Sequence, residues 1–235
     1  TKKTRKQQNK ITTRISTQFN IDPKNIKFNY VPRGHYKGDK VLSCTDNHLM
    51  CYRDAIKNNY PYILVFEDDA FIVKDSYTGD IDKTMNNILD FMKSHETWDI
   101  FYLGCIPASL YSTDKQYIKQ TTKAWCLHSY FISNKYMKHI LQFDTETLSN
   151  KVRSLSPRLF LGGYENGAND TYFALDFNEC YTIYPCIASQ SSIWGFTWWM
   201  YFTERITNVY SDFYIFVIST ILIFIYFFFR KIKIK

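Results

Sequence analysis

Apolar runs alternate with amphipathic segments through the middle of the chain. Residues 62–66, 99–104 and 128–132 are short runs rich in aliphatic and aromatic side chains, which is typical of buried strands. Between the first two runs, residues 81–95 have apolar side chains at helical spacing and predict a surface helix. Because strand and helix alternate, we expect an α/β domain with a mainly parallel sheet.

Three further segments predict helices. A helix over residues 45–59, capped by one of its first two residues, would place His48 in its first turn. Residues 1–19 predict a helix with one weak apolar stripe, and residues 134–143 predict a helix capped by its first residue. The remaining predictions are a loop over residues 20–43 with a short strand at 26–31, an irregular polar loop over 107–123, and a strand over 181–184.

Three consecutive acids, Glu67, Asp68 and Asp69, follow directly after the first apolar run. A run that is apolar at every position predicts a strand buried on both faces of a parallel sheet, and open α/β sheets bind ligands at the carboxyl ends of their strands. Three carboxylates this close repel one another, and a cation among them would relieve the repulsion. Oxygen ligands favour Mg²⁺ or Mn²⁺ over Zn²⁺, and such an ion could hold a diphosphate. The alternative is a solvated acidic turn.

Other candidate residues lie where predicted elements begin or end. Gly104 ends the second apolar run, where a missing side chain would let the backbone approach a ligand. Asp170 precedes a short predicted helical turn, at its positive end, and capping of that turn is its alternative role. A single histidine such as His48 more often has a structural role than a catalytic one.

The basic residues are concentrated at the two ends of the chain. Ten of the 29 lie within residues 2–14 and 230–235, which contain none of the 22 acids. The body between them therefore has 19 basic against 22 acidic residues, and this slightly acidic balance argues against a broad nucleic-acid-binding surface.

The six cysteines contain no CxxC pair, which argues against a structural zinc site of the ribbon type. Two alternatives remain for them, disulfides in a lumenal domain or buried thiols.

An uncharged apolar segment lies near the C-terminus. Residues 213–229 would span about 26 Å as a helix, and basic residues follow at once. We therefore predict a single-pass transmembrane helix over residues 210–230, with a basic tail at 231–235; a buried helix of a soluble domain is the alternative. Residues 193–209 are rich in aromatic side chains and would lie at the membrane interface or in a domain core. The cations predict a cytosolic C-terminus and a lumenal body, with a tail-anchored cytosolic body as the alternative.

Several motifs follow one another in a specific order. They are residues 44–48 (CTDNH), 60–69 (YPYILVFEDD), 98–104 (WDIFYLG), 129–133 (SYFIS), Asp170 and residues 185–190. This order resembles glycosyltransferase family 25, the lipopolysaccharide-modifying and procollagen galactosyltransferases, over about residues 1–192. The chain has Asn47 where the family has serine. The family's first strand, which ends in an Asn-Leu-Asp-Arg-like motif, has no counterpart before Thr4, so we expect an N-terminally truncated domain.

The resemblance implies a GT-A-like fold, a nucleotide-diphosphate sugar donor, most often UDP-galactose, and Mn²⁺ or Mg²⁺ at the acidic motif. It implies that Asp69, with Glu67 or Asp68, binds the metal, and that Gln190 and Gly104 lie near the donor. Its catalytic candidates are Asp170, facing the acceptor as a base, and His48, which would bond the donor or order the motif. The implied reaction transfers a hexose to a hydroxyl of a glycan or protein.

Two other functions are consistent with the same residues. A metal-dependent phosphohydrolase could use the three acids, but the sequence has no evident nucleophile or histidine cluster for it. A membrane-anchored, non-catalytic relic that binds a glycan or a protein is the second alternative.

Overall fold

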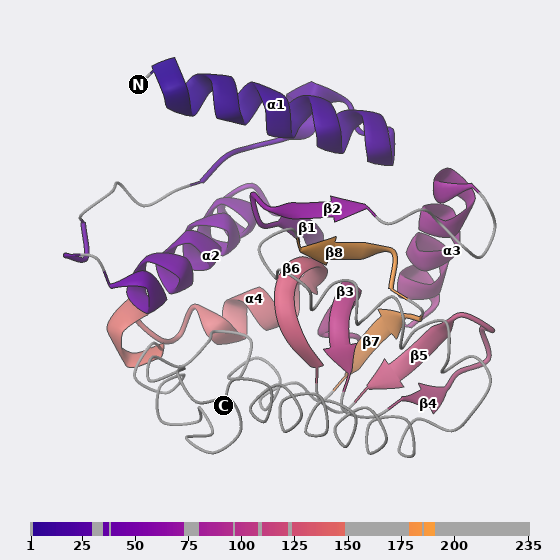
Figure 1. Cartoon of the computed structure of the whole chain (residues 1–235). Coiled ribbons are helices and arrows are strands. Elements are labelled where there is room, and N and C mark those ends of the chain that lie inside the picture. Colours follow the sequence, from indigo (N-terminus) through magenta and orange to yellow (C-terminus); the bar gives the residue numbers. More distant parts are fainter. Residues whose placement is uncertain are drawn as a thin grey trace, which may run out of the picture. The chain divides into compact units, whose positions relative to one another are not determined.

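The computed structural model describes residues 2–29, 35–37, 39–72, 80–95, 97–107, 110–121, 124–148, 179–184 and 186–190 (Figure 1). All of them belong to the first of two compact units, Thr1–Gln190. The predictions for Asp170, the aromatic segment at 193–209, the transmembrane helix and the basic tail lie outside the described residues. Within the described ranges, no helix is both long and apolar enough to cross a membrane.

The described elements mix helices and strands, but the predicted alternation fails between α3 and α4, where four strands follow one another. The helices are α1 (Lys2–Phe19), the short 3-10 helix η1 (Pro23–Asn25), α2 (Lys40–Lys57), α3 (Ile81–Ser94) and α4 (Asn134–Ile140). The strands are β1 (Tyr62–Phe66), β2 (Ala70–Ile72), β3 (Ile100–Pro107), β4 (Tyr111–Ser112), β5 (Ile118–Thr121), β6 (Ala124–Ser133), β7 (Cys180–Ile183) and β8 (Ala188–Gln190).

The main sheet has six strands in the order β1-β6-β3-β7-β5-β4, and β2 pairs with β8 in a separate small sheet. Only β3 and β7 are parallel neighbours; the other four neighbouring pairs are antiparallel. The α/β class is confirmed, but the prediction of a mainly parallel sheet is wrong. Residues 107–123, predicted as an irregular loop, contain the paired strands β4 and β5. This hairpin reverses the direction of the chain, so β6 runs antiparallel to both of its neighbours, β1 and β3.

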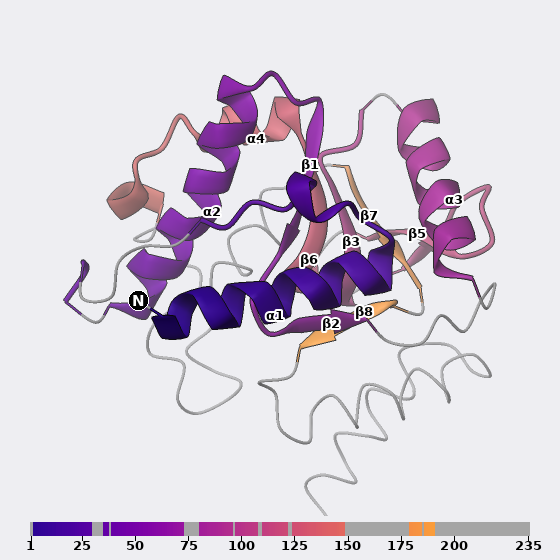
Figure 2. The same cartoon turned by 90° about the horizontal axis from the view of Figure 1, so that it is seen from above.

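Helices cover both faces of the sheet, as Figure 2 shows with α2 and α4 on one side and α3 on the other. Successive residues of β3 point to opposite faces, as the pleat of a strand requires. Ile100 and Tyr102 pack in a core cluster with residues of α2 and α4, whereas Phe101 and Leu103 pack in a second cluster with residues of α1 and α3. Two hydrophobic layers therefore hold the sheet between them.

Strand β1 lies at an edge of the sheet, not in its interior. Its apolar run is nevertheless packed on both faces: Ile63 and Val65 join the α2–α4 cluster, and Leu64 and Phe66 join the α1–α3 cluster. The ring of Phe66 lies 4.7 Å from that of Phe19 on α1, centroid to centroid. The predicted packing on both faces is confirmed, although of the five residues only Val65 is fully buried. The predicted parallel pairing is wrong, because β1 pairs antiparallel with β6.

Helix boundaries differ from prediction because side chains outside the apolar stripes act as caps. Asp39 accepts a hydrogen bond from the Leu42 N–H, so α2 begins five residues earlier than expected and His48 lies in its third turn instead of its first. Ser133, not the first residue of α4, caps that helix. No strand forms over residues 26–29, the described part of the one predicted at 26–31.

The stripe of α1 offers a direct test of the α1–α3 layer. Ile15 is buried, and Thr17 is exposed on the same helix. We expect Ile15→Ala to lower the free energy of unfolding by roughly 2–5 kcal/mol, because it leaves a cavity in a packed core. The matched control Thr17→Ala should change it by less than about 0.5 kcal/mol. Urea unfolding followed by circular dichroism measures both, and equal effects of the two substitutions would mean that α1 is not packed on the sheet.

Candidate functional site

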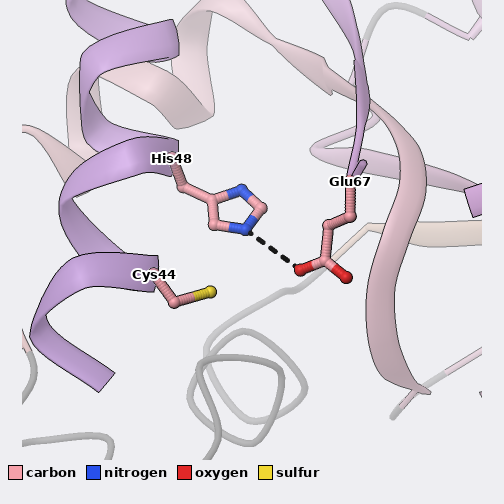
Figure 3. Close-up of side chains that lie close together, drawn as sticks. All are labelled: Cys44, His48 and Glu67. Atoms are coloured by element: carbon pink, nitrogen blue, oxygen red, sulfur yellow. Dashed lines mark ion pairs between the residues drawn. The ribbon is translucent and has the colours of Figure 1, made fainter. Parts of the chain in front are cut away.

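Helix α2 places two chemically active side chains one turn apart at the end of β1. Cys44 and His48 have the i, i+4 spacing that brings side chains onto one helix face. In Figure 3 both side chains point toward Glu67, the residue that follows β1. His48 is buried, with 5% of its surface exposed, whereas Cys44 and Glu67 are half-buried. The three residues therefore form a cluster that is buried at His48 and partly accessible to solvent at Cys44 and Glu67.

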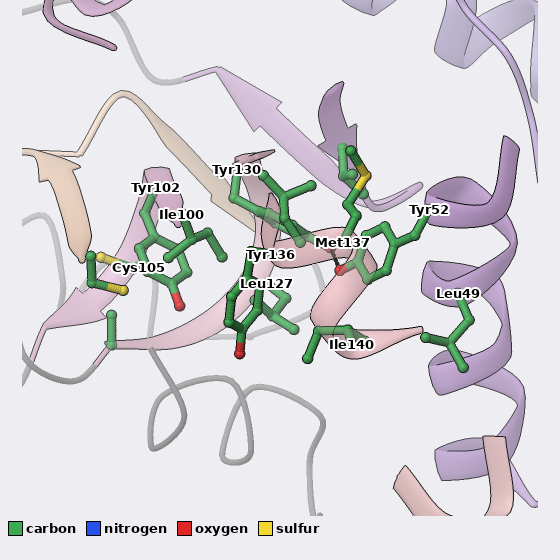
Figure 4. Close-up of a cluster of buried hydrophobic side chains, with 14 of the residues drawn as sticks. Leu49, Tyr52, Ile100, Tyr102, Cys105, Leu127, Tyr130, Tyr136, Met137 and Ile140 are labelled. Atoms are coloured by element: carbon green, nitrogen blue, oxygen red, sulfur yellow. Dashed lines mark hydrogen bonds between the residues drawn. The ribbon is translucent and has the colours of Figure 1, made fainter. Parts of the chain in front are cut away.

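A buried chain of hydroxyl groups fixes the His48 ring. Nδ1 of His48 lies 2.6 Å from the hydroxyl of Tyr130 on β6, and that hydroxyl lies 2.6 Å from the hydroxyl of Tyr52 on α2. Both tyrosines are fully buried among the core side chains in Figure 4. With Nδ1 engaged by Tyr130, the ring turns Nε2 toward Glu67, and the distance from Nε2 to Oε1 is 3.6 Å.

The electrostatics of the cluster favour a protonated His48 next to Glu67. Burial alone would lower the pKa of His48, but hydrogen bonds to Cys44 and Glu67 outweigh it and raise that pKa to about 10. Burial raises the pKa of the Tyr130 hydroxyl, and it does the same to Tyr52. The cluster therefore favours the protonated form of His48 beside Glu67 and keeps the two tyrosine hydroxyls neutral.

The three acids after β1 form a turn that separates them. The Glu67 N–H donates to the carbonyl of His128, 2.9 Å away, and the Ala70 N–H donates to the carbonyl of Glu67, 3.1 Å away. Asp68 is exposed and faces α1, where its carboxylate accepts a hydrogen bond from Gln7. The turn thus divides the predicted metal-binding acids between two environments.

In the part of the chain that the structure describes, one group of three possible metal ligands has its ligand atoms together. It consists of Cys44, His48 and Glu67, whose ligand atoms lie within 4.8 Å of one another. The predicted set of Glu67, Asp68 and Asp69 is not such a group, and metal binding by these acids stays a prediction.

Sequence analysis missed His128, which lies in β6 next to the acids. It is 2% exposed; its Nε2 lies 3.4 Å from the carbonyl oxygen of Ala188, and its Nδ1 has no hydrogen-bond partner among the described residues. Burial lowers the pKa of His128, and the charges of Glu67 and Asp69 oppose that effect. The sign available in the sequence was a histidine at the start of an otherwise apolar run.

Gly104 allows three strands to approach closely beside this histidine. A Cβ atom at Gly104 would overlap the carbonyl oxygen of Ala188 in β8 and Nε2 of His128 in β6. The pairing of β3 with β6 is irregular on both sides of Gly104, as at a β-bulge. The space beside this glycine is thus filled by protein, and its predicted contact with a donor stays a prediction.

Gln190 is the other predicted site residue whose backbone the structure describes. Gln190 pairs with Ala70 in the β2–β8 ladder, so its backbone lies beside the residue that follows the acids. Its place near the donor stays a prediction, as does the role of Asp170. The five described cysteines, Cys44, Cys51, Cys105, Cys180 and Cys186, are thiols and not disulfide-bonded.

Comparison with known proteins identifies one family. The model of glycosyltransferase family 25 (LPS biosynthesis protein) matches residues 16–150. No curated protein matches the chain. The matched region is more than half of the chain and includes α2, β1, β3 and β6. It therefore contains the cluster of Cys44, His48 and Glu67.

The close approach at Gly104 predicts a large effect of a small substitution. We expect Gly104→Ala to lower the free energy of unfolding by roughly 1–3 kcal/mol, because the added methyl overlaps a backbone carbonyl that cannot rotate away. Urea unfolding measures the loss.

A double variant separates the two overlaps. Adding His128→Ala removes the overlap with the ring and leaves that with Ala188, so the double variant should lose less stability than the sum of the single variants. An unchanged stability of Gly104→Ala would show that β8 does not pack against β3.

Proposed function

The chain belongs to glycosyltransferase family 25, and on this premise we propose that it transfers a hexose, galactose in the first instance, from a nucleoside-diphosphate sugar to a hydroxyl of a glycan or protein. The observation that supports this most is the placement of the family's acidic motif. Its first acid, Glu67, lies at the carboxyl end of β1 against a buried and rigidly held His48.

The donor diphosphate would lie beside Glu67 and Asp69. The charges of both acids act on His128, whereas Asp68 is turned to α1. Oxygen ligands from these two acids fit Mg²⁺ or Mn²⁺, so we assign metal binding to Asp69 with Glu67 and exclude Asp68 from it. The ion, when bound, would neutralise charge on the leaving diphosphate.

The protein's own groups would position and deprotonate the acceptor. The acceptor oxygen forms a bond to the anomeric carbon, the bond from that carbon to the diphosphate oxygen breaks, and the hydroxyl proton goes to a carboxylate. We propose Asp170 for this carboxylate. His48 would hold Glu67 in place through the contact between Nε2 and Oε1, and the Tyr130–Tyr52 pair would keep the His48 ring from rotating.

A non-catalytic glycan- or protein-binding protein is the alternative, and one observation favours it. The turn at 67–70 sends Asp68 away from Glu67, and Glu67 is engaged by His48. If this arrangement persists with ligands, the chain could bind a sugar without activating a diphosphate.

Calorimetry on the full chain with UDP, with and without Mn²⁺, tests the donor site. We expect Mn²⁺-dependent binding that Asp69→Asn weakens by at least about tenfold, the equivalent of about 1.4 kcal/mol, because this variant removes a charged ligand. The matched control is Asp68→Asn, which should keep the affinity within about twofold, since Asp68 faces α1.

Two results would count against the proposal. If Asp69→Asn and Asp68→Asn weaken Mn²⁺-dependent UDP binding equally, the metal is not bound by Asp69 in preference to Asp68. Binding of UDP-galactose with no release of galactose to water or to any acceptor would favour the non-catalytic alternative.

A further inference from the structure

Cys44, His48 and Glu67 have the chemistry of a transition-metal site that differs from the proposed donor metal. A thiolate, an imidazole and a carboxylate together are typical Zn²⁺ ligands, whereas Mg²⁺ and Mn²⁺ prefer oxygen alone. We propose that these three residues bind one Zn²⁺ ion, with its fourth position open to a water molecule or a ligand.

The distances fit such an ion. Zn–N and Zn–O bonds of about 2.1 Å at a tetrahedral angle place the nitrogen and oxygen about 3.4 Å apart. Nε2 of His48 and Oε1 of Glu67 are 3.6 Å apart, and the thiol of Cys44 lies within 4.8 Å of both ligand atoms. The distance between this nitrogen and this oxygen is thus within a few tenths of an ångström of the value that zinc requires. The thiol has to close in on both atoms by rotation of the Cys44 side chain, which α2 presents on the same face as His48.

The surroundings of His48 are those that zinc ligands need. A metal-binding histidine uses one ring nitrogen for the metal and the other for a hydrogen bond that fixes the ring. Nδ1 of His48 has that bond to Tyr130, which is held in turn by Tyr52. Nε2 is left to face Cys44 and Glu67 (Figure 3). Because Cys44 and Glu67 are half-buried, an ion can enter from solvent.

Zinc binding would replace the direct contact between Glu67 and His48 with two metal bonds. Zinc would take Oε1 of Glu67, the oxygen that faces His48, and would leave Oε2 of Glu67 together with Asp69 for a donor-bound metal. The zinc site itself does not depend on the proposed transferase activity.

Titration of the full chain with Co²⁺ under reducing conditions tests the site, because Co²⁺ reports its ligands by absorption. We expect one equivalent of Co²⁺ to give a thiolate-to-cobalt band and intense visible bands of a tetrahedral site. Zn²⁺ should abolish these bands, and a large excess of Mn²⁺ should not. Cys44→Ser should remove the thiolate band and weaken Zn²⁺ binding by at least about 10- to 100-fold, and Glu67→Gln should weaken it without removing the band.

Cys51→Ser is the matched control, because Cys51 is also a half-buried cysteine of α2 but is not in the cluster. It should keep both the band and the affinity, and far-ultraviolet circular dichroism should show that all variants are folded. The proposal is overturned if folded protein gives no thiolate band at saturating Co²⁺, if Cys44→Ser keeps the band, or if Cys51→Ser loses it.

Glu67 belongs to both proposed sites, and the Asp69 variant therefore separates the cobalt titration from the UDP-binding experiment. Asp69→Asn should bind Co²⁺ as the unchanged chain does, since Asp69 is outside the cluster. If the thiolate band is absent but Mn²⁺-dependent UDP binding is present, this inference alone is refuted. If the band is present but UDP does not bind, the proposed function alone is refuted.

Discussion

The position of β6 between β1 and β3 is the constraint on which the site depends. Its antiparallel register pairs Phe66 and Gly104 with the same residue, Ser129, on its two sides. The next residues along β6 in either direction are His128 and Tyr130, so both lie between the end of β1 and the Gly104 region of β3. A shift of one residue would turn every side chain of β6 to the opposite face. The acidic turn, the buried ring of His48 and the close approach at Gly104 all require this single register.

The polar groups of the site are held by the core. Tyr52 and Tyr130 contribute their rings to the α2–α4 hydrophobic cluster and their hydroxyls to His48. Burying a histidine beside a carboxylate is costly unless both are paired, and a rigid hydrogen-bond chain is one way to satisfy them. The consequence is a reactive nitrogen in a fixed position at the edge of the sheet. Transferase chemistry and metal binding would both use that fixed position.

The three acids illustrate how proximity in sequence differs from proximity in space. Consecutive carboxylates predict a shared cation on grounds of repulsion alone. The turn closed by the Ala70 N–H lets Asp68 relieve this repulsion by facing α1, where Arg14 also donates to its carbonyl, and Glu67 relieves it by pairing with His48. Two of the three acids thus have protein partners, and each partner residue lies at least 19 positions away in sequence.

The sequence by itself determined the α/β class, the α3 helix and the apolar runs of β1, β3 and β6, because local periodicity follows directly from side-chain spacing. Its motifs also pointed to the family and to His48 and the acids. Only the tertiary structure decided that β6 is antiparallel, that β1 is an edge strand, and that Cys44 and His128 join the site. Strand order and direction depend on long-range pairing, and apolar runs pack equally well in either direction. The partners of a side chain likewise depend on register, which no local pattern encodes.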